Sequence, residues 1–384
     1  MSNPRKNLIL KTIHGLSGLV FRSGEGITEL AARVHLHFSH LPWFSETPVE
    51  PSIEYAPLPY RVVHEVFRVL KNGAEGLNTS KIEPIGTFDN PLIRLTGVIN
   101  GILGDRLERW DNPLATPFQL YHRNDEKATT EETISEETEG IIVFIHGLCM
   151  NATDWDSRSF KNFADDLENN GYKVLKLHYN SGRSIPVNGR LLNKKLKTLV
   201  SSVSETTSLS LVGHSMGGLV AVSSYVQAQH ESASWLTHLK DIVTISSPFN
   251  GAPLEKIGHT ANSLLGLIPF TEPFMDLGLI RSTGLRELRE GDILPDSIDP
   301  HSEDFNKETV GRLLLLGVSL SDLSAETPIG DGMVPLDSSW ARDDEDLLNS
   351  LFQDVNRKHL KGMGHIEAMR NERVYSTLQE WMDR

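Results

Sequence analysis

The stretch "LVGHSMGGLV", residues 211–220, decides the fold, because it places one serine between two glycines at the end of an apolar run. Its central pentapeptide, GHSMG at 213–217, has the spacing G-x-S-x-G, with a predicted strand before it and a small-residue helix after it. In that context the serine stands on a sharp, strained turn between strand and helix. Gly213 and Gly217 keep side chains out of the space where the two elements cross. The motif therefore predicts that Ser215 is an exposed nucleophile.

Strands and helices alternate along the chain after residue 140. "IIVFIHG" is a continuous apolar run that ends in glycine, as expected for a strand buried on both faces of a parallel sheet. Strands separated by helices imply right-handed crossovers and an α/β fold, a mostly parallel sheet with helices on both faces. In such sheets the chemistry collects at the carboxyl ends of the strands. Further strands are predicted in "YKVLKLHY", "LSLVG", "DIVTISS" and "GRLLLLGVS".

A serine hydroxyl is a poor nucleophile without a base, so a histidine must follow it in the fold. Only His359 and His365 come after the last predicted strand-and-loop region. His365 occupies a strand-to-helix loop on the catalytic side and is the predicted base, whereas His359 lies within the short strand before it. The base needs an acceptor that fixes its tautomer. Asp331, between two glycines in the loop after "LLLLG", is the predicted acceptor, and Asp322 and Asp337 are its rivals.

An oxyanion hole is expected where "FIHGLCMNATDW" ends the first apolar strand of this region. There the backbone can turn its N–H groups towards the serine, and the N–H groups of Leu148 and Met216 are the predicted donors. His146 precedes the serine on another strand, so it is interpreted as a positioning residue beside Gly147. Cys149 has no evident base, which favours a packing role over a nucleophilic one.

Four stretches, "HGLCMNATDW", "GHSMGG", "SSPFNGAPLE" and "GDGMVP", together resemble the α/β-hydrolase superfamily, and within it the lipase-like and GPI-inositol-deacylase-like serine esterases. The resemblance covers about residues 140–384. "NGILGDRL" and "NPLATPFQLYHR" also resemble the front section of bacterial members that have a helical N-terminal extension.

The resemblance implies an α/β-hydrolase fold and assigns the same residues: Ser215 as nucleophile, Asp331 as acid and His365 as base, with the backbone donors already named. Relatives often have a histidine after the proline of "SPFNGAP", where this chain has Phe249. Because that position is not one of the catalytic three, the departure implies a changed pocket lining rather than lost activity.

The composition of successive segments predicts the domain organisation. Residues 1–124 are expected to form a helical N-terminal extension on or beside the core. Residues 125–139 hold seven acidic residues and one lysine, which indicates a solvated linker. Residues 140–384 form the predicted catalytic domain, with a lid or cap insertion at about 250–310. The insertion contains the apolar run "NSLLGLIPFTEPFMDLGLI", which favours an acyl-chain pocket or a lid over one.

The N-terminal segment shows helical periodicity. Residues 1–40 predict two amphipathic helices, and packing of this pair on the main domain is favoured because helix stripes more often face a core. The segment is locally basic, so contact with an anionic membrane surface is the alternative. "NPLIRLTGVINGILGDRL" predicts a further helix that stops near Gly104, and "FQLYHR" predicts an edge strand.

Composition excludes several other classes of protein. The net charge of −14 argues against a nucleic-acid partner, because phosphate binding needs a basic surface. Cys149 is the only cysteine, so an intramolecular disulfide cannot form and a reduced cytoplasm is expected. No apolar stretch reaches the roughly 20 residues that a bilayer span requires. A soluble, cytoplasmic protein follows, with membrane association limited to the N-terminal surface contact.

These observations predict a serine-dependent carboxylic ester hydrolase, an esterase or lipase that acts on a small-molecule or lipid ester with a hydrophobic acyl group. The reaction would proceed through an acyl-enzyme intermediate and would need no cofactor and no metal. An acyltransferase or a thioesterase could use the same three residues, and a non-catalytic scaffold with this fold is the remaining alternative.

Overall fold

The computed structural model describes most of the chain from the helix at residue 91 onward. The chain divides into two compact units, one drawn from Met1–Ile85 and Trp110–Leu114 and the other from Gly86–Arg109 and Ala115–Arg384. The predicted helices of residues 1–40, nearly all of the predicted linker and the middle of the predicted insertion lie outside the described residues, so those predictions stand as they were. The described residues are 15, 61, 64, 68, 91–123, 138–251, 282–302, 305, 309–321 and 330–384.

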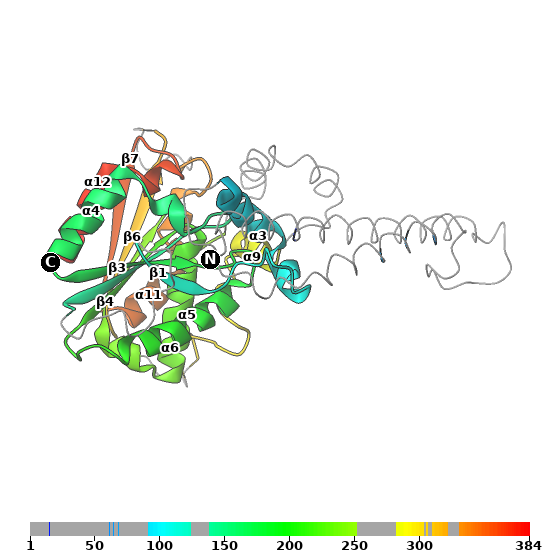
Figure 1. Ribbon diagram of the computed structural model, residues 1–384. Coiled ribbons are helices and arrows are strands. Elements are labelled where there is room, and N and C mark those ends of the chain that lie inside the picture. Colours follow the sequence, from blue (N-terminus) through cyan, green and yellow to red (C-terminus); the bar gives the residue numbers. More distant parts are fainter. Residues whose placement is uncertain are drawn as a thin grey trace. The chain divides into compact units, whose positions relative to one another are not determined.

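A seven-stranded sheet forms the centre of the second unit, in the order β1-β3-β2-β4-β5-β6-β7 (Figure 1). Strands β2 to β7 are parallel, and β1 pairs antiparallel with β3 at one edge. The predicted α/β-hydrolase fold is confirmed, and the predicted edge strand in "FQLYHR" is β1. The strands are β1 (Gln119–His122), β2 (Gly140–Ile145), β3 (Tyr172–His178), β4 (Ser208–His214), β5 (Leu239–Ile245), β6 (Arg312–Ser319) and β7 (Asp354–Lys361).

Alternate side chains of the central strands enter two separate apolar clusters, because successive strand residues point to opposite faces. On β2, Val143 packs into the cluster with α5 and α6, whereas Phe144 packs into the cluster with α4 and α12. Both faces of the sheet are therefore covered by helices, and every residue of β2 is buried. The helices are α3 (Pro91–Arg109), α4 (Arg158–Asn169), α5 (Ile185–Val200), α6 (Met216–Glu231), α9 (Thr283–Glu290), α10 (Leu336–Ser339), α11 (Glu345–Leu351) and α12 (Glu372–Met382).

Helix α3 continues to Arg109, past the predicted stop near Gly104. A Cβ at Gly104 would lie 1.8 Å from Asn180 Oδ1, so the missing side chain serves close packing and does not end the helix. Sequence pattern alone cannot separate these two uses of glycine. Among the described residues, no helix is both long and apolar enough to cross a membrane.

Candidate active site

Ser215 lies on a strained turn at the carboxyl edge of the sheet, the side on which the parallel strands β2 to β7 end. Strand β4 ends at His214, α6 begins at Met216, and Ser215 between them has φ 54° and ψ −126°. A positive φ costs a non-glycine residue free energy and persists only where the surroundings enforce it. The neighbouring strand enforces it here, because the Ser215 N–H donates to the carbonyl oxygen of Ile245 at 2.8 Å.

The two glycines of the motif are required by close approach. A Cβ at Gly213 would lie 2.3 Å from the backbone nitrogen of Gly218, and a Cβ at Gly217 would lie 2.2 Å from the carbonyl oxygen of Ile145. Real Cβ atoms do not approach other atoms so closely, so any side chain at either position would push the serine out of place.

His365 and Asp331 form a buried pair beside this turn. Asp331 lies in the loop after β6, His365 follows β7, and His365 Nδ1 is 2.6 Å from Asp331 Oδ2. The other carboxylate oxygen accepts hydrogen bonds from the backbone N–H groups of Met333, at 2.9 Å, and Val334, at 2.8 Å. Burial raises the pKa of Asp331, but His365 and these hydrogen bonds outweigh burial and hold the pKa below its ordinary 3.8. The carboxylate is therefore ionised and orients the imidazole ring.

The rival residues occupy other positions. The Asp337 side chain is 79% exposed on α10, which makes it unsuitable as a buried partner for a histidine. His359 lies on β7, as predicted, with its Nε2 atom 2.8 Å from Ser319 Oγ. Asp322 lies outside the described residues. Within the described part of the chain, His365 thus pairs with Asp331 and not with Asp337.

His214 connects the serine turn to the histidine loop, a role that the sequence reasoning missed. His214 Nε2 donates a hydrogen bond to the carbonyl oxygen of His365 at 2.9 Å, and the two rings lie 4.7 Å apart. No hydrogen bond joins Ser215 Oγ to His365 directly in the described part of the chain, so His214 provides the link. Burial, followed by the nearby His365, lowers the pKa of His214 to about 3 and keeps it neutral. The motif leaves this position open, so its only signal was a histidine at the end of a buried strand.

A side-chain hydrogen bond fixes the orientation of one peptide unit in the loop after β2. His146 Nδ1 is 2.9 Å from the carbonyl oxygen of Gly147 and donates to it. The N–H of the same peptide unit belongs to Leu148 and points in the opposite direction, because the peptide is planar and trans. Tyr179 Oη donates to the His146 carbonyl oxygen at 2.8 Å, and its ring stacks on the imidazole. Burial lowers the pKa of His146 to about 3, so a neutral ring fixes this peptide.

Two backbone N–H groups lie near Ser215, one in the residue that follows it and one in the loop after β2. A Cβ at Gly147 would lie 3.1 Å from Ser215 Cβ, so the loop passes directly against the serine. Leu148 N–H makes no hydrogen bond within the described residues, and Met216 begins α6, where the first N–H groups lack intrahelical partners. Such donors can stabilise negative charge that develops next to the serine. Burial raises the pKa of the Cys149 thiol to about 12, which makes it a poor nucleophile.

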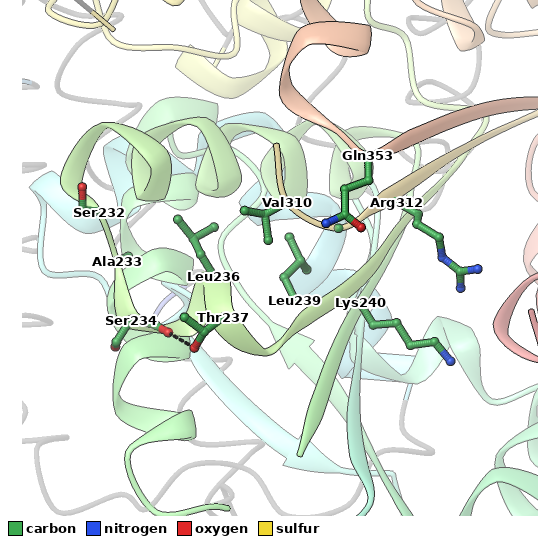
Figure 2. A pocket seen from close by; sticks show the side chains of 11 residues that line it. Ser232, Ala233, Ser234, Leu236, Thr237, Leu239, Lys240, Val310, Arg312 and Gln353 are labelled. Atoms are coloured by element: carbon green, nitrogen blue, oxygen red, sulfur yellow. Dashed lines mark hydrogen bonds between the residues drawn. The ribbon is translucent and has the colours of Figure 1, made fainter. Parts of the chain in front are cut away.

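A cavity of about 540 Å³ lies at the amino edge of the same sheet, the side on which the parallel strands begin (Figure 2). Its lining includes the first residues of β5 and β6, and each strand rises about 3.3 Å per residue, so the cavity is roughly 20 Å from Ser215. Two cationic side chains line it, and both already donate hydrogen bonds. Lys240 donates to the Met382 carbonyl oxygen at 2.7 Å, and Arg312 donates to the Asp241 carboxylate at 2.8 Å. The serine, histidine and aspartate are not part of this cavity.

Part of the chain matches one known protein family. Residues 137–265, about a third of the chain, match the family described as "PGAP1-like alpha/beta domain". No curated protein sequence matches the chain significantly.

Solved structures that resemble the chain include the mature form of the lipase BlEst2 from Bacillus licheniformis, with a TM-score of 0.42, 15% identity and coverage of 69% of this chain and 96% of that one. A soluble variant of monoglyceride lipase from Saccharomyces cerevisiae has a TM-score of 0.41 and 14% identity, with coverage of 70% of this chain and 89% of that one. A monoacylglycerol lipase from Paleococcus ferrophilus has a TM-score of 0.39 and 14% identity, with coverage of 70% of this chain and 98% of that one. Likeness at these identities concerns the fold alone.

Proposed function

We propose that this chain is a serine-dependent carboxylic ester hydrolase, and the match of residues 137–265 to the family described as "PGAP1-like alpha/beta domain" supports this. The observation that supports this most directly is the buried 2.6 Å hydrogen bond between His365 and Asp331 beside the strained Ser215 turn. A buried, oriented imidazole close to a strained turn that carries a serine has the composition that nucleophilic acyl transfer needs, although Ser215 is only 7% exposed.

The proposed reaction has two steps. His365 removes the Ser215 proton as the serine oxygen attacks the ester carbonyl, and the N–H groups of Leu148 and Met216 bind the oxyanion. Collapse of this tetrahedral intermediate expels the alcohol, which receives the proton from His365 and leaves an acyl-enzyme. Water, activated by the same imidazole, then attacks the acyl-enzyme and releases the acid. The Asp331 carboxylate stabilises the imidazolium that forms in both steps.

A hydrophobic acyl group is the proposed substrate class. The insertion sequence "NSLLGLIPFTEPFMDLGLI" supports it, because pockets for acyl chains are lined by apolar residues. Leu148 and Met216 add apolar side chains next to the serine, and both pack against the core cluster on the α5 and α6 face.

An active-site-directed fluorophosphonate and a chain-length series of p-nitrophenyl esters test the proposal. We expect the wild type to be labelled and to hydrolyse the esters, with kcat/KM rising as the acyl chain lengthens. Ser215→Ala should abolish labelling and lower kcat by about 10⁶-fold. Ser234→Ala, at the distant amino edge, is the matched control and should keep both activities.

Two results would contradict the proposal. Labelling that persists in Ser215→Ala would exclude Ser215 as the nucleophile, and a wild type that neither labels nor hydrolyses any ester of the series would indicate a scaffold. Addition of a competing alcohol identifies an acyltransferase, because the acyl group then appears on the added alcohol instead of on water.

A further inference from the structure

Helix α3 packs a glycine-lined face directly on the loop that contains Leu148. A Cβ at Gly101 would lie 2.3 Å from Cys149 Sγ, 2.7 Å from its backbone nitrogen and 2.8 Å from its Cα atom. A Cβ at Gly97, one turn earlier, would lie 3.0 Å from the carbonyl oxygen of Met150. Because glycine has no side chain, the α3 backbone comes into contact with the loop backbone itself.

The same helix is tied to two other segments at this edge of the sheet. Asn180, in the loop after β3, donates to the Gly104 carbonyl oxygen at 2.9 Å. Ser282, which precedes α9, donates to the Gly101 carbonyl oxygen at 2.6 Å. Figure 1 shows α3 and α9 side by side, in agreement with their contacts. Helix α3 is thus anchored from several directions while its glycine face contacts the loop.

The loop needs such support because its conformation is strained. Cys149 has φ 62°, in the left-handed region that non-glycine residues rarely adopt. Its N–H donates to Ser181 Oγ at 3.1 Å, so this amide is unavailable to a substrate oxyanion, whereas the Leu148 N–H makes no hydrogen bond within the described residues. A relaxed Cys149 would rotate the Leu148–Cys149 and Cys149–Met150 peptide planes and shift the adjoining Leu148 backbone that carries this N–H.

We propose that α3 is a positioning element for the oxyanion loop, defined as residues 146–150. By contact through Gly101, α3 holds Cys149 in the left-handed conformation and so keeps the adjoining Leu148 backbone where its N–H can reach the reacting carbonyl. Gly101 and Cys149 are then positioning residues, which act through Leu148 and do not touch the substrate. This inference rests on the proposed ester hydrolysis, and it makes residues outside the predicted catalytic domain of 140–384 necessary for activity.

Alanine at Gly101 is the direct test, because its Cβ would displace the oxyanion loop. We expect kcat to fall about 10²-fold, the loss typical of one missing oxyanion donor, with KM changed by less than about twofold. The affinity for a trifluoromethyl ketone, which forms a tetrahedral adduct with the serine, should fall in the same proportion. A purely structural role for Gly101 would lower the melting temperature and leave kcat and the adduct affinity of the folded enzyme unchanged.

Arg109→Ala is the control. It shortens an exposed side chain at the end of the same helix and leaves the Gly101 contact and the ties to Asn180 and Ser282 in place. We expect its kcat to stay within about threefold of the wild type. Gly97→Ala is the milder second variant if Gly101→Ala does not fold, and its looser contact should lower kcat by about tenfold with KM unchanged.

The single cysteine supplies a readout that does not depend on turnover. In the folded protein Cys149 should react slowly with a disulfide reagent such as DTNB, and Gly101→Ala should accelerate this reaction about tenfold or more whereas Arg109→Ala should not. If the wild type hydrolyses esters and Gly101→Ala keeps both its kcat and a slow thiol, the inference is wrong and the proposed function stands. If the wild type neither labels nor hydrolyses, the proposed function is wrong and this inference falls with it.

Discussion

The two edges of the sheet differ in how their backbone and polar groups are used. At the carboxyl edge, Cys149, Ser215 and Ser246 all have positive φ, and His146 and His214 each retain a buried ring nitrogen without a partner among the described residues. The amino edge has the 540 Å³ cavity, one positive-φ serine, Ser232, and one buried oxygen without a partner among the described residues, Asp241 Oδ2, while its two cations are engaged by ordinary partners. The carboxyl edge differs because several strained residues and unpartnered ring nitrogens gather around a single serine, which supports the proposed site there.

Exchange of the carboxylate beside His365 tests the carboxyl edge most severely. Asp331→Asn should lower kcat by about 10⁴-fold, because an amide favours the wrong imidazole tautomer and cannot stabilise the imidazolium. Steady-state kinetics on a p-nitrophenyl ester measure the effect. Asp337→Asn, at the exposed rival position, should leave kcat unchanged, and the opposite pattern between the two variants would reassign the acid.

The buried neutral histidines should make the carboxyl edge sensitive to acid. The folded pKa of His214 is about 3, below the ordinary 6.5, so the unfolded chain binds the proton more readily. The stability that His214 contributes is therefore complete above pH 6.5 and is lost as the pH falls towards 3, by about 1.4 kcal/mol per pH unit.

Urea unfolding between pH 7 and pH 4 measures this loss. His214→Gln cannot titrate and retains a side-chain N–H for the His365 carbonyl oxygen, so its stability should fall less steeply than that of the wild type. His301→Gln removes an exposed histidine and should follow the wild-type slope. Equal slopes for the wild type and His214→Gln would show that His214 is not held neutral in the folded protein.

Substitutions at the amino edge should have the smallest effect. Gln353→Ala enlarges the cavity far from Ser215 and should change kcat and KM by less than about twofold. Hydrolysis of the same ester measures it. A tenfold loss of kcat in this variant would show that the two edges are coupled and would remove the distinction between them.

The sequence predicts the sheet and the position of Ser215 because both depend on local pattern. Apolar runs of strand length recur between helical segments, and the glycines around Ser215 report a backbone crossing that admits no side chain. Asp331 could be ranked above Asp337 only by its place after a strand, since exposure is a tertiary property. Its pairing with His365 joins loops 34 residues apart and has no local signature.

Other parts of the site had no readable signal in one sequence. The hydrogen bond from His214 to His365 spans 151 residues, and the contact between Gly101 and Cys149 joins a helix to a loop that follows a different strand. Gly104 was misread because a glycine that allows close packing looks the same in sequence as one that ends a helix. Contact of residues 1–40 with an anionic membrane surface remains a prediction from local basicity, which liposome binding by a deletion variant would test.

The ties made by α3 also set an order of events during synthesis. The helix is among the first parts of this unit to leave the ribosome, but its partner Ser282 follows 181 residues after Gly101. At about 5–20 residues per second, α3 waits roughly 10–40 s for that partner. During this interval the oxyanion loop and then the nucleophile turn join α3 on the nascent chain, while the tie from Ser282 to Gly101 is still absent. Completion of the site therefore belongs to the last third of translation, after most of the sheet has been made.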